Sequence, residues 1–334
     1  MPVLWNLVPS PRLININVKM PSKFFHPRYW PTWLGVGILK LIILLPWSWQ
    51  MVLGKWLGIL IYSVASSRRK ISQINLEIAF PELSKADLEK LNRDHFISMG
   101  QGLIEAALGW WGSDKKIEKL AHVEDFDYLR DALKDGNVIM LGAHFSSLEV
   151  GGRIMALEMP IHVTYRPHQN ALIEYLVALQ RNTKYGKAIP KSRIRNMIKS
   201  IKNGSPVWYA TDQNYRGKGS LPVPFFGVDA PTNTGTARLA KMTNAKVIPC
   251  ITVRLTDKND SRKGYLIKTY PPLENFPSDD ALNDTTRLNQ ILEDLIKEYP
   301  DQYLWTHKRY KNYKTENRDF YKEYSKNQLS GHKS

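Results

Sequence analysis

His144 and Glu149 are the residues of this sequence whose types and spacing best suit proton-transfer chemistry. They follow a short apolar run, residues 138–141, which leads into a Gly-Ala step and predicts a buried strand. A histidine at the carboxyl end of such a strand lies where open α/β sheets place their ligand sites. Neutral imidazole is a usable base near pH 7, and a neighbouring carboxylate fixes its tautomer and stabilises the cation that forms. The pattern therefore predicts a general base, His144, assisted by Glu149.

Two structural interpretations of the same residues remain open. Ser146 and Glu149 have the spacing of a capping box, so the carboxylate could simply satisfy backbone donors at the start of a helix. His144 could equally be a hydrogen-bonded histidine of the core. Motifs this short also match by chance, so the rest of the chain has to decide between these interpretations.

Charged residues also follow two further expected strands. Arg166 follows the strand expected at 161–165, and Asp212 follows the one expected at 207–211. Because the carboxyl ends of parallel strands share one edge of a sheet, we expect both residues to join His144 in one cleft. Arg181, at the end of the helix after Arg166, can point to the same side. Arginine clamps bind phosphate and carboxylate groups bidentately, so these two arginines and Asp212 are candidate substrate-binding residues.

The second part of the chain alternates between strand and helix patterns. Strands are expected at residues 138–143, 161–165, 207–211, 223–226, 246–253 and 266–270, and helices at 147–157, 172–180, 192–203, 235–243 and 279–298. Such alternation predicts an α/β fold with a mostly parallel central sheet flanked by helices. The basic residues between 187 and 202 would flank the cleft, either as an anion-binding surface or as an ordinary solvated helix face.

Residues 33–65 are almost entirely apolar and predict a hydrophobic helical membrane anchor. Lys40, Pro46 and Lys55 interrupt the stretch, so a single span, two helices dipping into one leaflet, and a pair of core helices all remain open. The basic residues 68–70 place the remainder on the cytoplasmic side by the positive-inside rule. The expected divisions are an N-terminal segment (1–32), a membrane anchor (33–67), a helical region (68–125), an α/β core (126–310) and a basic polar tail (311–334).

Composition limits the class of partner. The 334 residues carry a formal net charge of +16, which favours an anionic partner such as a phosphorylated lipid, an acidic carrier protein, a membrane surface or nucleic acid. No nucleic-acid-binding motif accompanies this charge, so nucleic acid is not expected. Cys250 is the single cysteine, which excludes an intramolecular disulfide framework and argues against a cysteine-based zinc site.

Six segments in order resemble one known family. They are HFSSLE at 144–149, YRPHQN at 165–170, the position of Arg181, VWYATDQ at 207–213, PFFG at 224–227 and TGTARLA at 234–240. On these residues the chain is identified as a member of the bacterial lipid A secondary acyltransferases, within the glycerolipid (lysophospholipid) acyltransferase superfamily. YRPHQN and the glutamate at 149 are more similar to the lauroyl branch than to the myristoyl branch. The resemblance extends from about residue 25 to residue 309.

This resemblance implies a glycerolipid acyltransferase-like fold and an enzyme at the inner membrane, with its catalytic domain on the cytoplasmic side. The donor would be acyl-acyl carrier protein, and the acceptor a hydroxyl on an acyl chain of a phosphorylated, Kdo-bearing lipid A precursor. His144 and Glu149 would be catalytic, Arg181 and Asp212 functionally important, and no metal or other cofactor is implied.

Two rival functions remain. One is an acyltransferase acting on a glycerophosphate or a lysophospholipid, and the other is a non-enzymatic basic protein associated with membranes. The first differs only in its acceptor. The second predicts normal function after removal of the His144 imidazole.

Overall fold

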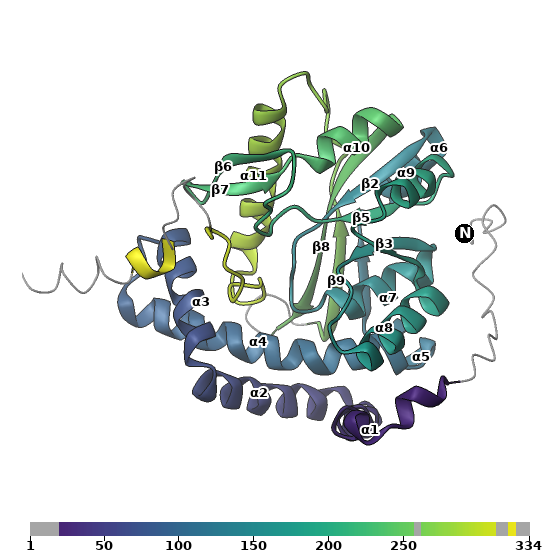
Figure 1. The fold of residues 1–334 in the computed structure, drawn as a ribbon, viewed down its shortest axis with the longest axis vertical. Helices are drawn as coiled ribbons and strands as arrows, with labels where there is room; N and C mark the ends of the chain where they lie inside the picture. Colours follow the sequence, from purple (N-terminus) through teal and green to yellow (C-terminus); the bar gives the residue numbers. More distant parts are fainter. Residues whose placement is uncertain (1–19, 257–261, 312–319, 325–334) are drawn as a thin grey trace, which may run out of the picture.

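The computed structural model describes residues 20–256, 262–311 and 320–324. Their central sheet has seven strands in the order β1 (Ala121–Glu124), β9 (Gly264–Thr269), β8 (Ala245–Leu255), β2 (Asn137–Leu141), β5 (Val207–Tyr209), β3 (Ile161–Tyr165) and β4 (Gly186–Pro190). Neighbouring strands run parallel except for β8 and β9, which pair antiparallel. The expected mostly parallel α/β sheet is therefore present (Figure 1).

Helices cover both faces of this sheet. They are α6 (Asp127–Asp135), α7 (Leu148–Glu158), α8 (Ala171–Lys184), α9 (Ile194–Lys202), α10 (Gly235–Thr243) and α11 (Ala281–Glu298). The central strands β2 and β8 are buried along nearly their whole length, as expected for strands covered on both sides. Gly136, at φ 158°, forms the extended link from α6 into β2. The result is a layered scaffold whose strand ends present the chemistry-bearing loops.

The N-terminal region is helical, with 3₁₀ turns η1 (Ser22–Phe25) and η2 (Pro27–Tyr29) and then α1 (Trp30–Ile42), α2 (Trp47–Val64), α3 (Ser66–Ala79), α4 (Lys85–Trp111) and α5 (Asp114–Glu118). Helix α2 packs lengthwise against α4 (Figure 1). Gly54, Gly58 and Gly100 make this close approach possible, because a Cβ atom on Gly100 would overlap the backbones of the other two glycines.

The expected membrane anchor is wrong. Among the described residues, no helix is both long and apolar enough to cross a bilayer. The apolar stretch is divided near Pro46 into α1 and α2. Helix α1 has 13 residues and so spans about 20 Å, against the ~30 Å of a hydrocarbon core. Helix α2 has 18 residues, but it also carries serine, glutamine and lysine.

The strand and helix expectations for the second part hold with small shifts in their ends. The strand at 161–165 and the helix at 235–243 match β3 and α10. Strands β1 and β4 and helix α6 were not anticipated. The strand expected at 223–226 is part of β6 (Ser220–Phe225), which pairs antiparallel with β7 (Val228–Asn233) outside the main sheet. Most of the expected N-terminal segment and polar tail lies outside the described residues.

Candidate active site

The imidazole of His144 is held by the carboxylate of Asp212. His144 Nδ1 lies 2.7 Å from Asp212 Oδ1, and the backbone N–H of His144 donates to Oδ2 over 3.0 Å. The side chain of Asp212 is fully buried, whereas that of His144 keeps 28% of its surface exposed. A carboxylate on Nδ1 leaves Nε2 as the basic atom of the neutral ring. The geometry is that of a general base with its orienting acid.

Strand order brings these two residues together across a sequence separation of 68 residues. His144 follows β2, Asp212 follows β5, and the two strands are neighbours in the sheet, with Leu141 opposite Tyr209. The backbone N–H of Gly142 extends this pairing by donating to the carbonyl of Tyr209 over 3.2 Å. Because both loops leave the same edge from adjacent strands, their first polar residues meet.

The segment after α11 fixes the other side of the His144 loop. Leu304 N donates to the carbonyl of His144 over 3.0 Å, and Ser146 N donates to the carbonyl of Gln302 over 2.8 Å. Phe145 and Tyr303 form an antiparallel bridge between these two bonds. The loop is therefore paired like a short strand and cannot move independently of residues 302–304.

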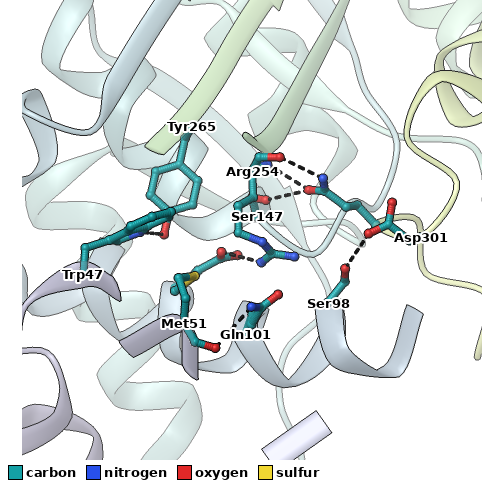
Figure 2. Close-up of polar contacts among 10 residues, drawn as sticks. Trp47, Met51, Ser98, Gln101, Ser147, Arg254, Tyr265 and Asp301 are labelled. Carbon is teal, nitrogen blue, oxygen red and sulfur yellow. Dashed lines mark hydrogen bonds and ion pairs between the residues drawn. The ribbon is translucent and has the colours of Figure 1, made fainter. Parts of the chain in front are cut away.

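Gln302 connects this pairing to the sheet. Its side-chain amide accepts from the backbone N–H of Arg254 over 2.8 Å and donates to the Arg254 carbonyl over 2.9 Å. Its oxygen also accepts from the Ser147 hydroxyl over 3.4 Å. Figure 2 shows Ser147 and Arg254, two members of this network. Arg254 also forms a buried ion pair with Glu105, and burial raises the pKa of the Glu105 carboxyl despite the nearby guanidinium. The network joins α4, β8 and the start of α7.

Electrostatics favour the charged form of the dyad. Burial lowers the pKa of His144, but the charge of Asp212 and its hydrogen bond outweigh burial and leave the pKa above the ordinary 6.5. Burial alone would raise the pKa of Asp212, yet the charge of His144 and the hydrogen bonds that it donates hold that pKa below its usual value. Asp212 is thus a carboxylate whenever His144 is ready to gain a proton.

In the described part of the chain, no hydrogen bond or ion pair joins Glu149 to the imidazole. Its carboxylate forms an ion pair with Arg181, and it accepts from Trp110 Nε1 over 2.8 Å and from the Tyr185 hydroxyl over 3.2 Å. The side chains of Arg181 and Glu149 are only 12% and 16% exposed. Burial lowers the pKa of Arg181, but the charge of Glu149 and its hydrogen bond raise it overall. The expected pairing of His144 with Glu149 is therefore replaced by two separate pairs.

The capping box that the sequence left open as an alternative is not formed at the start of α7. The residue preceding the helix is Ser147, and no side chain caps this end. The hydroxyl oxygen of Ser146 is buried without a hydrogen-bond partner. Glu149 is thus free of the capping role that the sequence left open, and its carboxylate serves Arg181.

A small hollow lies beside the Glu149–Arg181 pair. Its lining is mostly apolar and consists of Leu148, Glu149, Gly152, Met155, Val163, Thr164, Arg181, Tyr185 and Trp208. Trp208 also meets the His144 ring edge-on, with ring centroids 5.8 Å apart. The indole therefore contacts the imidazole and lines the hollow.

Arg166 and His307 belong to neither of the two charged pairs. Arg166 is exposed, and no hydrogen bond or ion pair joins it to the other four candidates in the described part of the chain. His307, an unassigned histidine of the sequence, accepts from the backbone N–H of Asn214 through Nε2 over 3.0 Å. Burial lowers the pKa of His307 to about 4, so its ring is neutral near pH 7. Within the described ranges, no three His, Cys, Asp or Glu side chains gather as a metal-binding group.

The sequence did not predict the residues that support the Glu149–Arg181 pair and the His144 loop. Trp110 and Tyr185 around Glu149, and Gln302 behind the loop, carry no local motif. The one available signal for Asp212 was its position directly after a strand, which placed it in the cleft but did not identify its partner. Only the order of β2 and β5 in the sheet supplies that information.

Comparisons with known proteins show which sequences this chain is similar to. Residues 18–312 match the family described as bacterial lipid A biosynthesis acyltransferase. The chain is 37% identical over 296 residues to the lipid A biosynthesis lauroyltransferase of Escherichia coli, covering 88% of this chain and 95% of that one. It is 36% identical over 295 residues to the palmitoleoyltransferase of that organism, with the same coverage. Identity to its myristoyltransferase is 25% over 288 residues, covering 85% and 88%.

Proposed function

Because this chain belongs to the bacterial lipid A biosynthesis acyltransferase family, we propose that its donor is acyl-acyl carrier protein and its acceptor a Kdo-bearing lipid A precursor. Family membership makes the chain an acyltransferase of lipid A biosynthesis. The proposal adds that the acyl chain is transferred to a hydroxyl on an acyl chain of that precursor, with His144 as the base. The observation that carries it is a partly exposed imidazole held at 2.7 Å by a fully buried carboxylate.

The proposed reaction is a direct transfer. Nε2 of His144 takes the proton from the acceptor hydroxyl while that oxygen attacks the thioester carbonyl. The new C–O bond forms, the C–S bond breaks, and the departing thiolate takes the proton back from the imidazolium. Asp212 keeps the ring oriented and stabilises its cationic form throughout. No acyl-enzyme intermediate is needed, because a thioester is already activated.

The Glu149–Arg181 pair acts beside the base in this proposal. Glu149 engages Nε and Nη2 of Arg181, and Nη1 is buried, so the guanidinium is committed mainly to this pair. We therefore assign the pair to shaping the hollow next to Trp208, and assign contact with an anionic substrate group to exposed Arg166.

The proposed place of action is the cytoplasmic face of the inner membrane. Large apolar side chains are exposed on α1, α2 and the turn between them: Trp30, Leu34, Ile38, Leu41, Leu44, Leu45, Trp49, Val52, Leu53, Trp56, Leu60 and Val64. Exposed apolar patches of this kind mark interaction surfaces, and aromatic residues favour the lipid–water boundary. Contact of this surface with lipid would bring an amphiphilic acceptor to the enzyme without any spanning helix.

Mass spectrometry tests the proposal. Purified protein is incubated with a Kdo-bearing lipid A precursor and a panel of acyl-carrier thioesters, and the mass gain of the precursor is measured. We expect one added acyl chain, and a rate about 10²–10⁴-fold lower for His144→Ala because the base is lost.

His122→Ala is the matched control, since His122 bonds only to the carbonyl of Lys263 in the described structure and should retain normal activity. Parallel reactions contain glycerophosphate or lysophospholipid as the acceptor. Acylation of those acceptors in preference to the precursor, or full activity of His144→Ala, would overturn the proposal.

A further inference from the structure

The segment between Glu174 and Asp212 contains no acidic residue. It carries eight basic ones: Arg181, Lys184, Lys187, Lys191, Arg193, Arg195, Lys199 and Lys202. The chain as a whole has 31 acidic residues among 334. A segment with eight basic residues and no acidic one therefore carries a large share of the net charge of +16. Arg181 and Lys184 belong to α8, and the last five lie on α9 and the turn before it.

Helix α9 separates an apolar face from a basic one. Met197, Ser200 and Ile201 are buried, where the helix packs against β2, β5 and α10. Its outward side carries exposed Arg195, Lys199 and Lys202, with Lys191 and Arg193 just before the helix. Ile194, also on this surface, is 54% exposed. We call these five cations together with Ile194 the α9 surface.

The cations of the α9 surface lack the ion pairs that several exposed lysines elsewhere form. Lys134, Lys241 and Lys246 each form an ion pair with an aspartate at 2.8 Å. None of the five α9-surface cations has a carboxylate partner among the described residues. Their charge is therefore available to an external acidic group.

The α9 surface begins at the catalytic cleft. Lys191 N donates to the carbonyl of Tyr165 over 2.8 Å, at the carboxyl end of β3. The charge of Lys191 is also close enough to His144 to contribute to lowering its pKa. From there the nine residues of α9 extend about 14 Å along the molecule. A partner bound along α9 would present a flexible arm directly to the cleft.

We infer that the α9 surface is the docking site for an acidic carrier protein that delivers the acyl thioester. This inference rests on the proposed function, because it assumes a carrier-bound donor. Complementary charge suits such a partner, since it accelerates encounter and fixes orientation. Exposed Ile194, the first residue of α9, offers one apolar contact beside these cations.

A lipid surface fits the same charges less well. Helices α1 and α2, which carry the exposed apolar side chains, run along the lower edge of Figure 1, whereas α9 lies at its upper right beside α10. Helices α7 and α8 lie between these two regions (Figure 1). A membrane in contact with α1 and α2 would leave α9 facing water, where a soluble carrier can reach it.

Binding of fluorescently labelled acyl-carrier protein tests the inference. The variant carries Arg195→Gln, Lys199→Gln and Lys202→Gln, three exposed positions outside the catalytic machinery. The matched control carries Lys85→Gln, Lys115→Gln and Lys119→Gln, which remove the same charge from α4, α5 and the residue after α5. We expect the Kd of the α9 variant to rise at least about tenfold, that of the control to stay within twofold, and kcat at saturating carrier to be retained.

Three results would contradict the docking site, and they differ in what they imply for the proposed function. An unchanged Kd in the α9 variant, while the wild type acylates the precursor from carrier, overturns the docking site and leaves the proposed function intact. Failure of the wild type to bind or use the carrier overturns both. Loss of binding to phosphatidylglycerol vesicles in the α9 variant, without loss of carrier binding, assigns the surface to lipid instead.

Discussion

The two carboxylates of the cleft, Asp212 and Glu149, have opposite partners. Asp212 is fully buried and bonds to an imidazole, a group that gains and loses a proton near neutral pH. Glu149 is 16% exposed and bonds to a guanidinium, which stays charged at every physiological pH. The first pair can take part in proton transfer, whereas the second is a fixed ion pair supported by Trp110 and Tyr185. A carboxylate's role therefore follows from its partner and not from its distance along the chain.

The largest effect should come from Asp212→Asn. An amide loses the charge that stabilises the imidazolium and can favour the wrong tautomer of His144, so we expect kcat to fall about 10²–10⁴-fold. Steady-state kinetics with carrier-bound donor measure this fall. The stability of the variant is measured alongside by urea unfolding, and a loss of activity explained entirely by unfolded protein would remove Asp212 from the dyad.

A smaller loss of activity, with a clear loss of stability, should follow Glu149→Gln. Removing one partner of a buried pair leaves Arg181 uncompensated, which costs roughly 3 kcal/mol of unfolding free energy. Adding Arg181→Met should restore part of that stability, and a double-mutant cycle in urea measures the coupling. If Glu149→Gln instead unfolds like the wild type but loses as much activity as Asp212→Asn, Glu149 contributes directly to catalysis and is more than a fixed ion pair.

The finest distinction is in the pH profile. His144 must be neutral to act as a base, so activity should rise with pH through a pKa above 6.5. In Asp212→Asn the raising influence is gone while burial and Lys191 remain, so the acid limb of the residual activity should move to lower pH. In Glu149→Gln the limb should stay in place. Rates of both variants are measured across pH 5 to 9. An acid limb that moves only in Glu149→Gln would show that Glu149, and not Asp212, raises the pKa of His144.

The same pKa shifts also make the stability of the folded state depend on pH. The raised pKa of His144 stabilises the folded state below the pKa of the unfolded chain, and this contribution fades as pH rises through the folded value. The lowered pKa of Asp212 stabilises the folded state above its ordinary value of 3.8 and is lost as the solution becomes more acidic. The dyad therefore favours folding between those two limits.

Local sequence patterns located five of the seven strands of the sheet and, apart from α6, the helices that cover it. Apolar runs such as that of β2, and the charged residues after β3 and β5, depend on neighbours within a few positions. Strand order and the return of residues 302–304 to the His144 loop depend on contacts across the whole chain, which no spacing rule encodes. The N-terminal helices show a third limit, because apolar composition alone does not distinguish a buried or surface helix from one that crosses a bilayer.

The bridge between Phe145 and Tyr303 has a consequence for synthesis of the protein. His144 and Asp212 emerge from the ribosome long before Gln302 and Leu304, so the catalytic loop lacks its supporting strand while translation continues. The pairing that holds the His144 loop therefore forms only after residues 302–304 have been made.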